Sequence, residues 1–237
     1  LSRSKVTLFD HNDVASLEAA LKKNDVEMSA QDKLVFRRFI AVEGIYDRTC
    51  SICRLKEIVE LAAKYKIRVI SDDTNAMGVL GKTGRGSFEH WGIQFDGERH
   101  IICAGLDRTF SGVGAIVIGC ERVVSHQRLS GLGYCYSAAS PPYSAIVGTT
   151  CIGIVDANPE LPETLQKKLA QFYNIFEQQF GADGPFTLLG DKSSPICVLR
   201  PAQLKELWNA EKFDDATVYK ALTEITSILR DKHHIII

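Results

Sequence analysis

Four short apolar runs alternate with helix-like segments along the first two thirds of the chain. The runs are Phe39–Ile45, Ile67–Ser71, Arg99–Ala104 and Gly114–Gly119. Between the first two lies Leu55–Lys66, in which apolar residues recur at helical spacing and charged residues fill the other positions. Strands that are apolar on both faces and alternate with helices are typical of a mainly parallel sheet with helices on both faces. The pattern therefore predicts an α/β fold.

The two ends of the chain follow other patterns. Near the start, Lys5–Phe9 predicts a short strand, and Asp13 is a suitable N-cap for a following helix because its carboxylate can accept hydrogen bonds from free backbone amides. Beyond the Pro141-Pro142 break, the sequence predicts two helices and two short strands: Leu161–Phe180, Phe186–Leu189, Ile196–Leu199 and Asp215–Lys232. We expect residues 1–160 to form an incomplete large domain. Residues 161–237 are expected to form a connecting helix and part of a smaller α+β domain.

Composition narrows the class of protein. The 237 residues are 45% hydrophobic and 24% charged, and 28 Lys plus Arg against 29 Asp plus Glu give a formal net charge of −1. This balance argues against a nucleic-acid-binding protein, which usually needs a basic face. The hydrophobic fraction is too high for a disordered chain. No apolar run approaches the roughly 18–20 residues that span a bilayer.

Both ends of the sequence predict a fragment. Leu1 is not a start residue, and no signal peptide is visible after it. The run 235–237 is apolar and β-branched, which is typical of the beginning of a buried strand. A sheet cut in this way would leave unpaired edges, so we expect the isolated piece to be poorly soluble or to aggregate.

The seven cysteines predict reduced thiols rather than disulfides or a metal site. Their number is odd and their spacing is wide, which is typical of proteins that face the cytosol. Cys50 and Cys53 have the spacing of a redox or zinc pair. A second pair at ligand spacing is missing from the sequence, so we expect no metal.

The segment Asn75–Gly86 is rich in glycine and invites comparison with a phosphate-binding loop. Gly81-Lys82-Thr83 matches the end of that motif, but Ala76 stands where the motif requires a glycine. Gly84 and Gly86 also disfavour a helix that begins at Thr83. A different site is suggested by Asp72, which follows an apolar run at the edge where open α/β sheets bind ligands. Asp72 could equally cap the following turn.

The order and spacing of several motifs resemble the α-oxoamine synthases, which are pyridoxal-phosphate (PLP) transferases of fold type I. The motifs are Glu43–Tyr46, Leu55–Lys66, Asp72–Gly86 and Glu89–Gly92. Within that family, the chain is most similar to a non-catalytic subunit type, through the stretches 1–4, 9–13, 78–86, 126–130, 133–138 and 141–143. The resemblance is strong over 1–156 and thin beyond. It implies the large PLP-binding domain of the family.

The resemblance also implies that this chain does not catalyse alone. Asp72 stands where catalytic members pair a carboxylate with the cofactor's pyridine nitrogen. Asn75 replaces a histidine that stacks on the cofactor ring, and Arg108 stands at the position of the lysine that forms the Schiff base. That linkage needs a neutral primary amine, whereas a guanidinium stays protonated. Asp72 would then be the one cofactor-binding residue retained, with Asn75 as a vestige.

By the same resemblance, the chain pairs with a catalytic long-chain-base subunit that holds PLP covalently and condenses L-serine with palmitoyl-CoA in sphingolipid biosynthesis. The residues expected to face that partner are Gly84, Arg85, Gly86, Arg108 and Tyr143, and Ser137 is a candidate contact to the partner's cofactor phosphate. Arg85 suits an anion such as a CoA phosphate or a partner carboxylate, or is simply solvated. The subunits implied in this way act at the cytosolic face of the endoplasmic reticulum membrane.

Two other functions stay open at this point. An active homodimeric α-oxoamine synthase would need a lysine at position 108, where the sequence has arginine. A nucleotide-binding module without a partner would use the glycine-rich segment and Lys82, against which Ala76 argues.

Overall fold

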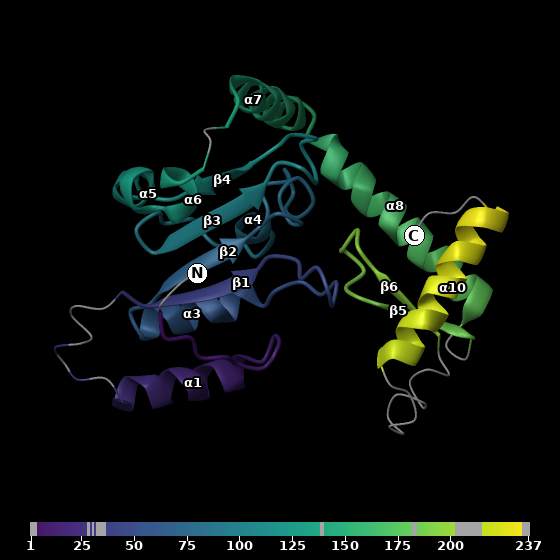
Figure 1. The fold of residues 1–237 in the computed structure, drawn as a ribbon, viewed down its shortest axis with the longest axis horizontal. Coiled ribbons are helices and arrows are strands. Elements are labelled where there is room, and N and C mark those ends of the chain that lie inside the picture. Colours follow the sequence, from purple (N-terminus) through teal and green to yellow (C-terminus); the bar gives the residue numbers. More distant parts are fainter. Residues whose placement is uncertain are drawn as a thin grey trace. The chain divides into compact units, whose positions relative to one another are not determined.

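The structure is a computed structural model that describes residues 4–27, 29, 31, 37–137, 140–181, 184–201 and 215–233 (Figure 1). Residues 1–3 and 234–237 lie outside these ranges, so most of the motif 1–4 and the strand expected to begin at 235–237 are not described. Backbone contacts divide the chain into two compact units. The first comprises 1–173 with 190–197, and the second comprises 174–189 with 198–237. The sequence-based boundary at residue 160 stays a prediction.

The first unit is built on a four-stranded sheet in the order β1-β2-β3-β4. The strands are β1 (Phe39–Glu43), β2 (Arg68–Asp72), β3 (His100–Gly105) and β4 (Ala115–Ile118). β1, β2 and β3 run parallel, and β4 is antiparallel to β3. The α/β fold and its mainly parallel sheet are thus confirmed. β1 differs from the expectation of two buried faces, because Phe39 and Ala41 are exposed at the edge of the sheet.

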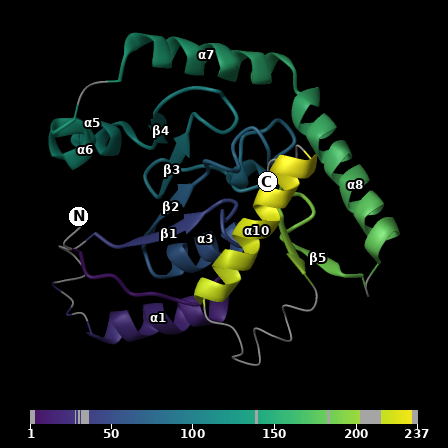
Figure 2. The same ribbon diagram turned by 45° about the vertical axis from the view of Figure 1, so that its right-hand side comes forward.

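Two helices cover the sheet near its first strands. α3 (Leu55–Lys64) buries Leu55, Ile58 and Ala62, as its helical periodicity predicts, and it packs on β2. α1 (Val14–Glu27) lies on the outer side of α3 (Figures 1 and 2). The Asp13 carboxylate accepts hydrogen bonds from the amides of Ala15 (2.8 Å) and Ser16 (3.0 Å), which confirms its role as N-cap.

One strand predicted near the start of the chain is wrong. Residues 5–9 form no strand among the described residues, and Val6 and Leu8 are largely exposed. Alternating apolar residues stabilise a strand only where a neighbouring strand supplies hydrogen bonds and a face to pack on. Here the segment is tethered by its polar side chains instead: Lys5 forms an ion pair with Glu27.

Three further helices follow β4. They are α5 (Glu121–Ser130), α6 (Leu132–Cys135) and α7 (Pro142–Ala157). The sequence analysis did not identify α7, since its apolar residues have no helical periodicity. Its few buried residues are small (Ser144 and Gly148), and Tyr143 and Ile146 are exposed. Among the described residues, no helix is both long and apolar enough to cross a membrane.

α8 (Glu160–Phe180) begins in the first unit and ends in the second, and its bounds agree with the predicted helix Leu161–Phe180. The second unit contains the antiparallel pair β5 (Phe186–Leu189) and β6 (Val198–Pro201), together with α10 (Asp215–His233). β5 matches its prediction, whereas β6 begins two residues later than the predicted Ile196. Phe180 packs edge-on against Phe186, which anchors the end of α8 to the pair.

Candidate functional site

The carboxyl ends of β1, β2 and β3 form one edge of the sheet, here called the carboxyl edge. It consists of Glu43, Asp72 and the residues that follow each strand. Because the strands are parallel and in register, Glu43 lies beside Asp72, and Asp72 beside Cys103. Burial, followed by the charge of Asp72, raises the pKa of the Cys103 thiol above its ordinary value. The edge is therefore acidic, as expected for the end of a sheet that carries Asp72.

Asp72 is exposed at this edge and caps the turn that follows it. Its Oδ1 accepts hydrogen bonds from the amide (3.0 Å) and the hydroxyl (2.6 Å) of Thr74. The Thr74 hydroxyl oxygen in turn accepts a hydrogen bond from the amide of Gly105 at the end of β3. The capping role considered from the sequence is thus present, and the exposed carboxylate still reaches solvent at the edge.

The neighbouring Asp73 has the opposite environment, because it is completely buried. Its carboxylate accepts hydrogen bonds from the hydroxyl of Ser71 (2.6 Å) and from the amide and hydroxyl of Ser87 (2.8 and 2.7 Å). Gly44 and Gly86 pack so closely on it that an added Cβ would lie 2.6 and 2.4 Å from its oxygens. Asp73 therefore joins the end of β2 to the start of α4 (Ser87–His90).

Asn75 and Arg108 are brought together by a residue that the sequence analysis missed, Asp47. The Asn75 amide nitrogen lies 3.5 Å from both the Asp47 carboxylate and the Ile45 carbonyl. The Arg108 guanidinium lies 3.8 Å from Asp47 and 3.7 Å from Asp107. These three side chains, Asp47, Asn75 and Arg108, are called the vestigial edge below. The distances are long and the charged groups exposed, so each pair adds little to stability.

The glycine turn, residues Gly78–Gly86, lies beside the vestigial edge. Gly78, Gly81, Gly84 and Gly86 all have positive φ angles, between 78° and 87°. The turn is closed by backbone hydrogen bonds from Gly78 to Gly84 (2.7 Å) and from Gly86 to Leu80 (2.9 Å). A Cβ at Gly78 would lie 2.1 Å from Thr109, the residue after Arg108. Glycine is required here by both conformation and space.

The three turn residues expected to face a partner have different surroundings. Gly84 and Gly86 are buried within this chain, and a Cβ at Gly84 would lie 3.0 Å from Pro162 of α8. Arg85 between them is exposed and pairs with Asp156 at 3.3 Å. Of the three, Arg85 alone presents a side chain at the surface.

The remaining partner-facing candidates lie on the segment after β4. The Ser137 hydroxyl is exposed and donates a hydrogen bond to the carbonyl of Gly133. Tyr143 is exposed on the first turn of α7. Within the described residues, neither side chain is hydrogen-bonded to Asp72, Asn75 or Arg108. Asp72, Asn75 and Arg108 thus all lie on the segments at the end of β2 and β3, and Asn75 and Arg108 both approach Asp47.

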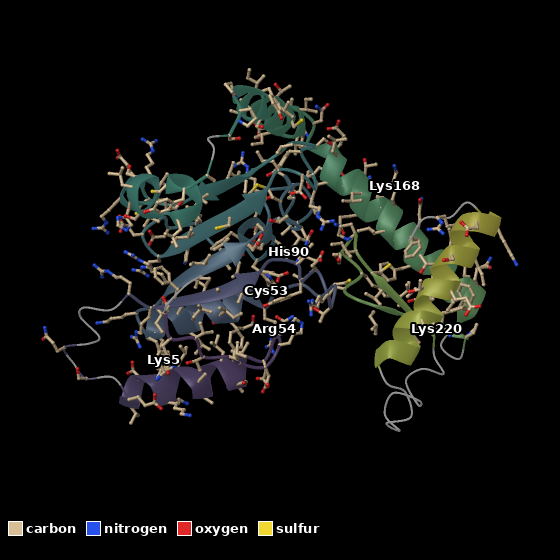
Figure 3. All side chains as sticks on the ribbon, in the orientation of Figure 1. Lys5, Cys53, Arg54, His90, Lys168 and Lys220 are labelled. Carbon is tan, nitrogen blue, oxygen red and sulfur yellow. The ribbon has the colours of Figure 1, made fainter. Side chains whose placement is uncertain are left out.

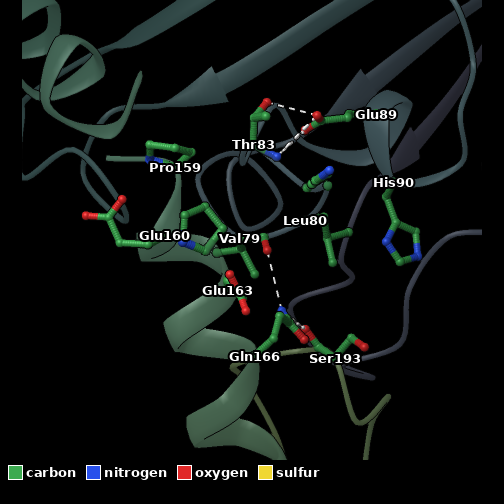
Figure 4. Close-up of a pocket in the computed structure, with 13 residues that line it drawn as sticks. Val79, Leu80, Thr83, Glu89, His90, Pro159, Glu160, Glu163, Gln166 and Ser193 are labelled. Carbon is green, nitrogen blue, oxygen red and sulfur yellow. Dashed lines mark hydrogen bonds between the residues drawn. The ribbon is translucent and has the colours of Figure 1, made fainter. Parts of the chain in front are cut away.

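A groove of about 890 Å³ lies between the glycine turn and the start of α8 (Figure 4). Lys82, Glu89 and His90 line one side of it, and Glu163 and Gln166 line the other. Gln166 crosses it, because its amide donates to the carbonyls of Val79 (3.4 Å) and Ser193 (3.2 Å). Burial lowers the pKa of His90, and the charge of Asp191 partly offsets that effect.

Cys50 and Cys53 lie in a buried environment that suits a packing role rather than a reactive one. Cys53 and Arg54, labelled in Figure 3, lie in the turn before α3. Cys50 and Cys53 are buried and free, and burial raises the pKa of the Cys53 thiol to about 12. Such a thiol stays protonated and is a poor nucleophile. Across the described ranges, no group of three His, Cys, Asp or Glu side chains is placed to hold a metal ion.

Comparisons with known proteins agree with the motifs. A family model described as aminotransferase class I and II matches residues 1–237. The chain is 34% identical over 234 residues to long chain base biosynthesis protein 1b of Oryza sativa subsp. japonica, covering 96% of this chain and 48% of that protein. It is 32% identical over 218 residues to serine palmitoyltransferase 1 of Saccharomyces cerevisiae, covering 90% and 38%. The chain thus spans about half the length of the curated relatives it matches.

Solved structures show the same fold. The serine palmitoyltransferase of Sphingomonas wittichii superimposes with a TM-score of 0.66 at 21% identity, covering 81% of this chain and 44% of that one. A serine palmitoyltransferase variant from S. paucimobilis, solved with a bound PLP–myriocin aldimine, gives 0.67 at 25% identity, covering 81% and 46%. The resemblance drawn from the motifs and the fold implied by it are confirmed.

Proposed function

From the premise that this chain belongs to the aminotransferase class I and II family, we propose that it is part of the non-catalytic subunit of a serine palmitoyltransferase. It would pair with a catalytic paralogue that condenses L-serine with palmitoyl-CoA to 3-ketosphinganine, the entry reaction of sphingolipid biosynthesis. One observation carries the proposal: a chain similar to long chain base biosynthesis protein 1b has Arg108 where the resemblance places the Schiff-base lysine.

The carboxyl edge does not fit covalently held PLP. Bound PLP acts as an electron sink that stabilises a carbanion, and it is held through a lysine amine. Residues 101–118 contain no lysine, and the Arg108 guanidinium cannot act as a neutral amine. Asn75 offers an amide rather than an aromatic face, and that amide is turned toward Asp47 and Ile45. Asp72 alone fits its expected role, since its carboxylate is exposed at the edge. The partner would therefore hold PLP.

The same residues give this chain a different task, which is to complete a site on the partner. Arg85 and Arg108 are exposed cations on the segments that follow β2 and β3, and the shortest contact of each to a carboxylate is 3.3 Å or more. A guanidinium held this loosely can exchange its partner for a substrate or partner anion. We assign Arg85, Arg108 and Tyr143 to the subunit interface, with Ser137 near the partner's cofactor phosphate. The buried Gly84 and Gly86 would support Arg85 from within.

The proposal extends to location through resemblance. We assign the whole protein to the cytosolic face of the endoplasmic reticulum membrane, as a heterodimer. The membrane attachment would come from a part of the protein other than the helices described above.

The alternatives are weakened by specific contacts. The active homodimer lacks its lysine, as described. The nucleotide-binding module would need free amides in the glycine turn, but the amides of Thr83 and Arg85 donate to the Glu89 carboxylate at 3.1 and 2.9 Å. The following helix, α4, begins at Ser87 rather than at Thr83. A phosphate would have to displace this internal anion.

Production of the whole protein with a lysine-bearing paralogue tests the proposal. We expect serine- and palmitoyl-CoA-dependent release of 3-ketosphinganine from the complex, and none from either chain alone. The matched control replaces the paralogue's Schiff-base lysine by alanine, which should abolish the product. Full activity of the paralogue in the absence of this chain would contradict the proposal.

A further inference from the structure

We propose that Glu89 is a positioning residue: it serves as a built-in anion at the centre of the glycine turn, and so holds Arg85 as a pre-oriented cation for a phosphate of the acyl-CoA substrate. The inference rests on the proposed function, because it concerns the site shared with the partner. It assigns a role to the Glu89 carboxylate, which the sequence analysis used only as part of a motif.

The hydrogen bonds of Glu89 carry the first step. Its carboxylate accepts from the amide of Thr83 (3.1 Å), the hydroxyl of Thr83 (2.8 Å) and the amide of Arg85 (2.9 Å), as the dashed lines to Thr83 in Figure 4 show in part. The amides of Thr83 and Arg85 converge on one anion, as backbone amides do where they bind phosphate in other proteins, whereas the amide of Gly84 between them donates to the Gly81 carbonyl. The two donors to Glu89 are called the amide nest below. Here the anion belongs to the chain itself.

The glycines around this carboxylate carry the second step. A Cβ at Gly81 would lie 2.2 Å from a Glu89 oxygen, so the backbone approaches the carboxylate as closely as glycine allows. Gly86, on the other side of Arg85, is packed in the same way against the buried Asp73. The backbone on both sides of Arg85 is therefore held by a carboxylate, Glu89 on one side and Asp73 on the other. The direction in which the Arg85 side chain leaves the backbone is set before any ligand binds.

The side chain of Arg85 carries the third step. Its guanidinium is 73% exposed and lies 3.3 Å from Asp156, which is 71% exposed. An exposed pair of this kind contributes little and is readily exchanged. A guanidinium can bind phosphate through two parallel hydrogen bonds, and a fixed backbone reduces the entropy lost on binding. Since Glu89 already fills the amide nest, a substrate phosphate would bind outside the turn, at the side chain.

Calorimetry on the complex of the whole protein with its catalytic partner tests this directly, and it needs no turnover. The probes are CoA and pantetheine, which lacks the phosphates. We expect Arg85→Met to weaken CoA binding about tenfold and to leave pantetheine unchanged, which corresponds to the loss of one charge-assisted contact. We expect Glu89→Gln to weaken CoA binding in the same selective way by about threefold. Arg122→Met, which removes an exposed cation paired with Glu98, is the matched control and should change neither.

Each other outcome has a defined meaning. Unchanged CoA affinity in Arg85→Met would overturn the inference, and so would an equal loss for both probes. A loss of subunit affinity with CoA binding intact would show that Arg85 binds a partner carboxylate, which also overturns it. If Glu89→Gln lowers the melting temperature strongly, Thr83→Val is the second variant, because it removes one hydrogen-bond donor to Glu89. It should give a smaller loss of CoA affinity with pantetheine affinity unchanged. No loss of CoA affinity in Thr83→Val would refute the positioning role. Failure of the parent complex to make product would count against the proposed function alone.

Discussion

The glycine turn and the vestigial edge are neighbours that are built in opposite ways. Thr109, next to Arg108, donates a hydrogen bond of 2.7 Å to the carbonyl of Met77, next to Gly78, so the two regions are joined. On either side of the turn in sequence, the carboxylates of Asp73 and Glu89 accept hydrogen bonds of 2.6–3.2 Å from backbone amides and hydroxyl groups. At the vestigial edge, the contacts of Arg108 are ion pairs of 3.7–3.8 Å between exposed groups.

Under the proposed function, this difference indicates which parts of a catalytic framework a non-catalytic chain would keep. Substitutions of the two carboxylates beside the turn would destabilise the fold, because they would leave buried hydrogen-bond donors without an acceptor. The vestigial edge is where the resemblance places the cofactor contacts, and we expect substitutions at its exposed positions to cost little stability. On that proposal, Asn75 and Arg108 could stand in place of catalytic side chains without a change in the shape of the neighbouring turn. The substitutions below test that contrast, from the largest expected effect to the smallest.

Asp73→Asn should have the largest effect. The new amide nitrogen would face the donors of Ser71 or Ser87 in a fully buried position, so we expect a loss of about 3 kcal/mol in the free energy of unfolding. Urea unfolding of the whole protein measures it. Asp72→Asn is the matched control at the adjacent, exposed position and should cost less than about 1 kcal/mol. Equal costs for the two substitutions would show that the buried network is not the anchor.

Gly86→Ala should come next. Its φ of 86° strains any side chain, and the new Cβ would lie 2.4 Å from the Asp73 carboxylate, so we expect a loss of about 2 kcal/mol. Gly92→Ala separates the two causes, because Gly92 has a φ of 64° but no atom within 4 Å of an added Cβ. That control should cost about 1 kcal/mol. Thermal unfolding of both variants ranks them, and the reverse ranking would contradict the packing described.

Glu89→Gln should have a smaller effect that depends on pH. Burial raises the pKa of Glu89, but hydrogen bonds from Arg85 and Thr83 outweigh it and bring the pKa below its ordinary value of 4.5. A lowered carboxyl pKa contributes stability that is fully present above the unfolded-state value and is lost as the pH falls through the folded-state value. We expect the free energy of unfolding of the parent to exceed that of the variant by about 1 kcal/mol at neutral pH. This difference should shrink as the pH falls below the ordinary pKa of a glutamate. Urea unfolding across pH measures this gap; a gap independent of pH would be the contrary result.

Arg108→Met and Asp47→Asn should have the smallest effect on stability. Exposed ion pairs at these distances contribute little, so we expect each variant to lose less than about 0.5 kcal/mol. A double-mutant cycle on the free energy of unfolding measures their coupling. Coupling well above that value would mean that the vestigial edge is a structural element like the turn.

The sequence predicted the framework well because its elements have strong local signals. Leu55–Lys66 could be identified from helical periodicity, and the apolar runs marked the four strands of the sheet. Lys5–Phe9 has a similar local pattern but no neighbouring strand, which a local pattern cannot show. α7 was missed for the converse reason, since an apolar helix without periodicity has no stripe to detect.

The contacts of the candidate site residues could not be predicted from the sequence, and their assignment to a site stays a prediction. Asp72 and Asp73 are adjacent, and the resemblance singled out the first; alternation with Val69 and Ser71 on the buried face was the signal that Asp73 points inward. Asp47 and Glu89 gave no such signal. Each accepts from residues that only the folded backbone brings near, and no periodicity links Glu89 to the amides of Thr83 and Arg85.

The central claim is that this chain supports a site whose cofactor is held by another subunit. Borohydride reduction of the complex with its catalytic partner, followed by peptide mass spectrometry, would locate the covalently bound PLP. The account predicts a PLP-modified lysine on the partner and no PLP-modified lysine on this chain. Lys82, which lies within the glycine turn, should also be unmodified. A PLP-modified lysine on this chain at the stoichiometry of the complex would contradict it.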